Sequence, residues 1–268
     1  MLNTLLPILL FAALALAVIG AAKRFLMWRR GRPAQVDWLG GLLAMPRRYM
    51  VDLHHVVARD KYIANTHVAT AGGFVPAILF PLIPLAVLAM VAGREWRSLF
   101  RTPTGRDVLL MLAIAGVNIL VSVAVALVLQ HLFKMSENPV NAMLAEASNT
   151  ARILFYVKTA PQLFGEEVVS ILPFLAILWF CHTKLSLSRK SAIITAWLCT
   201  ALIFGAMHLP TYDWNFLQCF LVIGTARIVL LSGYIITKNI WVSTGSHIIN
   251  DWLLFTIMAA FLSGHATG

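Results

Sequence analysis

Residues 160–182 read APQLFGEEVVSILPFLAILWFCH, an apolar run interrupted by the adjacent pair Glu166 and Glu167. The run is long enough to cross a bilayer, because about 20 helical residues span roughly 30 Å of hydrocarbon. A charged side chain at the membrane centre costs at least about 2.5 to 3.5 kcal/mol. Two histidines, His208 and His247, lie in later apolar runs. Several ionisable groups in such places predict a shared, partly wet cavity, which is the candidate functional site.

The composition places the 268-residue chain outside the range of soluble globular proteins. It is 60% hydrophobic and 12% charged, with a mean hydropathy of +0.81. The apolar runs predict an all-α, polytopic transmembrane helix bundle of about seven spans. The spans are expected near residues 2–22, 68–92, 108–132, 151–182, 191–208, 214–236 and 240–262. We therefore expect a multi-pass integral membrane protein of the cell (inner) membrane.

The chain is organised in four consecutive parts. Residues 1–66 are expected to form the first transmembrane helix and a basic interfacial segment, and residues 67–150 to form spans without chemistry. Residues 151–262 hold the ionisable pattern and are the expected catalytic core. Residues 263–268 form a short tail.

The net charge of +10 is carried by short basic segments beside the apolar runs. Such segments meet anionic lipid headgroups, so the bilayer is the expected partner of these charges. Nucleic acid is not expected, because no basic stripe is interleaved with exposed aromatic residues. The cysteines Cys181, Cys199 and Cys219 have no paired spacing, which predicts neither a disulfide framework nor a thiolate zinc site.

The charge pattern does not fix the orientation in the membrane. If the spans alternate, the basic segment from Lys23 to Lys61 lies on one side, while the basic loops after the second and fourth spans lie on the other. The second span contains Pro76, Pro81 and Pro84, which bend helices. One hypothesis is that this kinked element does not cross the membrane.

The spacing of the ionisable residues predicts how they face one another. His247 and Asp251 are four residues apart and share one helix face, with Asn250 beside them. Glu166 and Glu167 point about 100° apart, so one can face the cavity and the other a supporting partner. Two close buried carboxyls resist full ionisation together, which makes the one in the cavity a better base than a solvated glutamate. Such a base beside a histidine can activate water, and polar groups on another helix can stabilise an oxyanion.

Three short motifs, each on its own span and in this order, resemble the CPBP family of CAAX prenyl endopeptidases and bacteriocin-processing or immunity proteins, also called Abi. The motifs are Glu166-Glu167, Phe204-x-x-x-His208 and His247-x-x-x-Asp251. They cover about residues 160–252, which is under half of the chain.

The resemblance implies an intramembrane endopeptidase that cleaves a membrane-associated polypeptide. Glu166 would activate a water molecule with help from His208, while His247 and Asp251 would stabilise the oxyanion. Asp251 is favoured over Asn250 for this polar role. Zinc is left open as a cofactor, because His-Glu-x-x-His is absent and the histidines come singly from distant spans.

The chain departs from the family pattern at one position. The family motif continues as Glu-Glu-x-x-x-Arg, but the arginine position is Ile171 in this sequence. Glu167 then lacks its expected partner, and we expect Arg227 in the sixth span to replace it. The missing arginine also fits a divergent or inactive member. Two other function classes remain open: an ion or solute transporter that uses the buried acids, and a non-catalytic immunity or scaffold protein.

Overall fold

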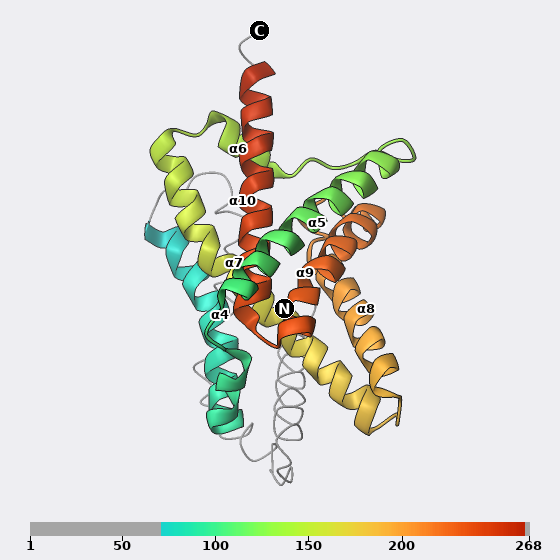
Figure 1. Ribbon diagram of the computed structural model, residues 1–268. Coiled ribbons are helices and arrows are strands. Elements are labelled where there is room, and N and C mark those ends of the chain that lie inside the picture. The colour runs from blue at the N-terminus through green and yellow to red at the C-terminus, as the bar shows by residue number, and fades with distance from the viewer. Residues whose placement is uncertain (1–70, 266–268) are drawn as a thin grey trace, which may run out of the picture.

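The computed structural model describes residues 71–265, so the expected first span at 2–22 and the basic segment after it lie outside the described residues. The described part is all helical, as predicted (Figure 1). Its elements in chain order are α4 (Ala71–Ala92), η1 (Gly93–Leu99), α5 (Gly105–Leu129), α6 (Pro139–Glu146), α7 (Asn149–Thr183), α8 (Arg189–Met207), η2 (Gln218–Ile223), α9 (Gly224–Thr237) and α10 (Ile240–His265). The short helix α6 was not predicted.

Six helical segments of the described part are long and apolar enough to cross a membrane. They are Gly73–Leu99, Gly105–Leu129, Asn149–Thr183, Arg189–Met207, Gln218–Thr237 and Ile240–Ser263. They correspond to the second through seventh predicted spans, which confirms a multi-pass membrane protein. The second element is one helix that continues through its three prolines into η1. Its length favours a crossing element over the hypothesis that it does not cross.

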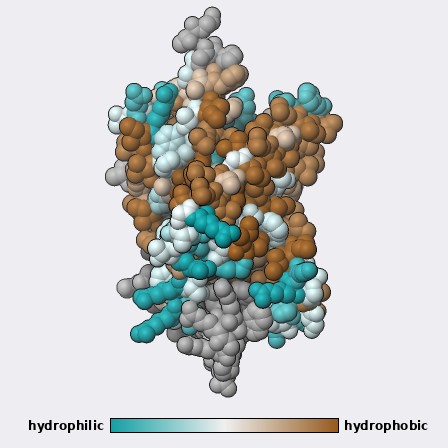
Figure 2. Space-filling model, in the orientation of Figure 1, coloured by the Kyte–Doolittle hydropathy of each residue, from teal (hydrophilic) through white to brown (hydrophobic). Residues whose placement is uncertain are grey.

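The outer surface of the bundle is apolar at mid-height, and the buried interior holds several polar groups among its apolar side chains. Figure 2 shows hydrophobic residues over the middle of the surface, with hydrophilic residues gathered toward the two ends. Leucines such as Leu109 and Leu120 are 68% and 72% exposed, whereas the polar residues Asn118 and Arg227 are fully buried. This distribution suits a bilayer, because lipid solvates apolar side chains while polar groups must find partners within the protein.

Helix α7 positions the candidate site because it packs against α4, α8 and α10. Leu172 and Leu175 in the C-terminal half of α7 pack with Leu231 and Tyr234 of α9 in one buried apolar cluster. Gly205, three residues before His208, lets helix α8 approach η2 closely. A Cβ at this position would lie 2.6 Å from the backbone oxygen of Cys219. The backbones of α8 and η2 therefore pack directly against each other at Gly205.

The sixth span begins later than predicted. Asp213 and Trp214 have φ values of 50° and 58°, a left-handed conformation that interrupts a helix. The helix therefore starts at residue 216 instead of 214 and opens with the π-helical turn η2. Gln218 in this turn exchanges two hydrogen bonds with the backbone of Ser136, at 2.8 and 2.9 Å. These bonds fasten the loop after α5 to the start of the sixth span.

The basic loops of the described part gather at one end of the bundle. The loop after η1, the turn between α7 and α8, and the turn between α9 and α10 all lie in the lower half of Figure 1. The guanidinium of Arg101 donates to the backbone oxygen of Thr237 at 3.0 Å, which joins the first of these to the third. The loops after the second and fourth spans therefore lie on the same side, as alternation of the spans predicts.

Candidate active site

Glu167 is fully buried and paired with Arg227. The Arg227 Nη1 donates to Glu167 Oε1 at 2.5 Å, and both side chains have no exposed surface. The contact expected between these two residues is therefore present, with α9 supplying the cation that the motif lacks at Ile171. Arg227 also lies over the ring of Phe204, with its Cζ 3.7 Å from the ring centroid. This cation–π contact joins α7, α8 and α9 at one buried point.

His247 of α10 lies among three carboxylates. Its Nδ1 is 2.8 Å from Glu167 Oε1, while its Nε2 is 3.8 Å from Glu166 Oε2 and 3.6 Å from Asp251 Oδ1. A proton on Nδ1 is held by Glu167, so Nε2 is the nitrogen that faces Glu166 and Asp251. The spacing of four residues places His247 and Asp251 on one face, as predicted.

The two adjacent glutamates have different surroundings. The Glu166 side chain is 15% exposed and that of Asp251 is 22% exposed, whereas Glu167 is inaccessible. The two residues with exposed carboxylates both approach His247 Nε2. This matches the expectation that one glutamate faces the open side and the other faces a supporting partner. Of the two glutamates, Glu166 is the one that a substrate or water can reach.

His208 packs against Phe204 and does not bond to Glu166 in the described residues. Its Nδ1 lies 2.9 Å from the backbone oxygen of Phe204, and its ring centroid is 4.5 Å from the Phe204 ring. The same phenyl ring is 6.4 Å from the His247 ring, so Phe204 lies between the two histidines. Within residues 71–265, no hydrogen bond or ion pair joins His208 to Glu166.

Asn250 supports Asp251 and is itself held by α5. The Asn250 Nδ2 donates to Asp251 Oδ1 at 2.8 Å, and Asn118 Nδ2 donates to Asn250 Oδ1 at 2.9 Å. Asn118 lies outside the three sequence motifs, so the sequence did not single it out as part of the site. The signal was its position as the lone strongly polar residue inside its span, but its partner depends on how α5 and α10 cross.

We expect Asn118→Ala to weaken both the fold and the orientation of Asp251. Interhelical hydrogen bonds in membranes contribute about 0.6 to 1.7 kcal/mol, so thermal melting in detergent should show a modest loss. Any catalytic rate that uses Asp251 should fall by no more than about tenfold. The matched control is Ser122→Ala one turn later, because Ser122 Oγ has no hydrogen-bond partner in the described part of the chain. Equal melting of the two variants would argue against the support role of Asn118.

A second residue that sequence reasoning missed is Tyr212, in the turn after His208. It is 8% exposed, and its Oη accepts a hydrogen bond from Asn138 Nδ2 at 3.2 Å. Burial raises the pKa of Tyr212 to about 12, and the nearby charges of Asp251 and Glu166 act in the same direction. The phenol therefore keeps its proton at neutral pH, and its O–H remains able to donate a hydrogen bond. Its place in the short segment between the fifth and sixth spans, four residues after His208, was the available signal.

The arrangement does not fit a metal centre. No group of three or more His, Cys, Asp or Glu side chains in the described residues is placed to hold a metal ion. The Nδ1 of His247 is already directed at the Arg227-bound carboxylate of Glu167, and the Nδ1 of His208 is directed at a backbone oxygen. Zinc would need three or four converging ligands, so we derive no step through a metal.

Comparison with known proteins assigns this region to a family. Residues 148–253 match the family described as Type II CAAX prenyl endopeptidase Rce1-like, and the three motifs lie within this match. The chain thus carries an Rce1-like domain of the CPBP family, as the motifs suggested. Residues 3–123 match a domain of unknown function, DUF3483.

One curated relative resembles the other part of the chain. It is described as a probable membrane-anchored ferredoxin of Chromohalobacter salexigens and is 69% identical over 78 residues in the N-terminal part. The match covers 29% of this chain and only 12% of that protein. No solved structure matches.

Proposed function

We infer that the protein is an intramembrane endopeptidase that hydrolyses a peptide bond in a membrane-associated polypeptide. The observation that carries this inference is the convergence of Glu166, Glu167 and Asp251 on His247, with Glu166 and Asp251 partly exposed. The Rce1-like domain supports the same reaction class. Four convergent polar groups in an apolar bundle are costly unless they are used together.

The charges of the site suit attack by water. Glu167 and Arg227 neutralise each other in the buried interior. An imidazolium at His247 then faces two carboxylates, those of Glu166 and Asp251, so these three groups carry a net charge of −1 until Glu166 takes up a proton. When Glu166 takes up a proton, the imidazolium is free to stabilise the negative charge that develops on the substrate.

In this mechanism Glu166 removes a proton from water as the water oxygen adds to the carbonyl carbon. The oxyanion accepts a hydrogen bond from Nε2–H of His247, and Asp251 orients this imidazole through its contact with the same nitrogen before the oxyanion forms. Glu166 then delivers its proton to the leaving nitrogen as the C–N bond breaks. His208 has its Nδ1 against a backbone oxygen, which leaves Nε2 to hold the water beside Glu166.

The N-terminal similarity fits a role in membrane anchoring. The first cysteine of this chain is Cys181, so the preceding residues supply no thiolate ligand for an iron–sulfur cluster. We therefore assign the part shared with the probable membrane-anchored ferredoxin to the bilayer, with no cysteine ligand for a cluster in it.

The test compares protein termini in membranes of cells that carry the wild type or Glu166→Gln, at equal accumulation of both proteins. Cleaved termini that disappear with Glu166→Gln would identify the peptidase and its substrate together. Termini that are the same in both would contradict hydrolysis by Glu166 and favour ion transport or a scaffold, which flux measurements would then separate.

A further inference from the structure

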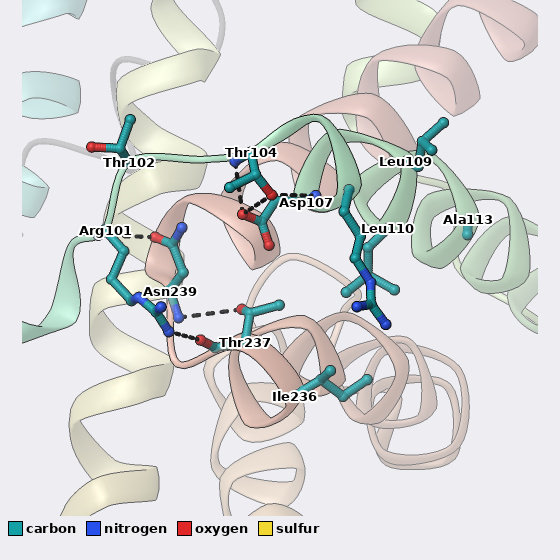
Figure 3. A pocket seen from close by; sticks show the side chains of 11 residues that line it. Arg101, Thr102, Thr104, Asp107, Leu109, Leu110, Ala113, Ile236, Thr237 and Asn239 are labelled. Carbon is teal, nitrogen blue, oxygen red and sulfur yellow. Dashed lines mark hydrogen bonds between the residues drawn. The ribbon is translucent and has the colours of Figure 1, made fainter.

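A cavity of about 690 Å³ lies at the basic end of the bundle, away from the candidate active site. It is formed by the start of α5, the end of α9 and the turn into α10 (Figure 3). Its lining includes Arg101 and Arg106 as well as the apolar residues Leu109, Leu110 and Ile236. Nothing in the proposed hydrolysis uses these residues.

The lining holds two arginines, of which Arg101 is structurally fixed. Arg101 is held by two bonds, from its Nη1 to the backbone oxygen of Thr237 at 3.0 Å and from its backbone N–H to Asn239 Oδ1 at 3.3 Å. A guanidinium has five N–H donors, so this use of one leaves others for a ligand. Arg106 lies five residues further on and is exposed.

The one carboxylate in the lining is already engaged. Asp107 Oδ2 accepts hydrogen bonds from the backbone N–H of Thr104 at 2.8 Å and from its hydroxyl at 2.9 Å, which completes the cap of α5. Two guanidinium groups and one carboxylate leave the lining with a net charge of +1. The cavity is therefore suited to an anion.

After the first turn of α5, the lining contributed by this helix is apolar, and the end of α9 adds Ile236. In Figure 3, Leu109, Leu110 and Ala113 follow α5 away from Arg101 and its partners. Leu109 is 68% and Ile236 is 63% exposed, so this wall faces the medium that surrounds the spans. A ligand that contacts both parts of the lining must carry an anionic group at one end and hydrocarbon at the other.

We propose that this cavity binds an anionic phospholipid, with its phosphate at Arg101 and Arg106 and an acyl chain along Leu109 and Ile236. The position suits such a ligand, because basic pockets between spans at a positively charged membrane face bind lipid headgroups. A soluble phosphate would use the arginines but would leave the apolar wall without a partner.

The experiment measures lipid binding to the full-length protein in detergent by native mass spectrometry and by thermal melting. The probes are phosphatidylglycerol, phosphatidylcholine with the same acyl chains, and glycerol phosphate without chains. We expect phosphatidylglycerol to bind several-fold more tightly than phosphatidylcholine and to raise the melting temperature. Arg106→Gln should weaken this binding about fivefold, the contribution of one arginine at an anionic membrane surface.

Arg97→Gln is the matched control, because Arg97 is an exposed arginine of the same basic end that does not line the cavity. It should bind phosphatidylglycerol as the wild type does. An equal loss in Arg97→Gln, or equal binding of phosphatidylcholine, would overturn the assignment. A full effect from glycerol phosphate alone would also overturn it, by assigning the cavity to a soluble phosphate.

Discussion

Arg227→Ala is expected to destabilise the protein more than any other single truncation in the site. It leaves the carboxylate of Glu167 buried without its cation, and breaking a buried pair in this way costs about 3 to 5 kcal/mol. It also removes the guanidinium from the ring of Phe204. Size-exclusion profiles and thermal melting in detergent should show aggregated or weakly folded protein.

The control for this variant is Arg189→Ala, which makes the same change at an exposed residue at the start of α8. It should melt as the wild type does. Removing both charges with Glu167→Gln and Arg227→Met should restore much of the stability, because no buried charge is left unpaired. If Arg227→Ala melted at the wild-type temperature, the ion pair between Glu167 and Arg227 would not be what holds the helices together.

The Arg227 contact was predictable because burial of charge is so restrictive. The sequence has a glutamate with no arginine one turn later, and Ile171 at that position is fully buried in the core. Few cations lie within the predicted spans, so Arg227 was the natural replacement. The helical spans were predictable for a similar reason, since the thickness of the bilayer sets the length of each apolar run.

Other parts of the site depend on three-dimensional packing that periodicity does not encode. Asn118 reaches Asn250 only because α5 crosses α10 at that height, and the two residues are far apart in sequence. The turn that carries Tyr212 is positioned by positive φ values at Asp213 and Trp214. Aspartate adopts this conformation fairly often, but a bulky tryptophan rarely does, so the sequence does not predict the turn. Sequence spacing alone could not identify these supports.

Glu166→Gln and Glu167→Gln are expected to fail in different ways, although the two residues are adjacent. Glutamine at 166 cannot take a proton from water, so the cleavage rate should fall by about 10²- to 10⁴-fold. The fold should persist, because the Glu166 side chain is partly exposed and its contact with His247 Nε2 is long, at 3.8 Å. Glutamine at 167 instead leaves Arg227 buried without its counter-charge, so stability and activity should fall together.

The measurement pairs thermal melting with initial cleavage rates in proteoliposomes, using the substrate that the comparison of termini identifies. Glu146→Gln is the matched control, because it makes the same change at an exposed glutamate at the end of α6. We expect Glu166→Gln to melt at the wild-type temperature without cleaving the substrate, and Glu167→Gln to melt at a lower temperature. This result would identify Glu166 as the base and Glu167 as its structural support. If Glu166→Gln retained its cleavage rate while Glu167→Gln lost it without unfolding, the two roles would have to be exchanged, and the buried carboxylate would be the base.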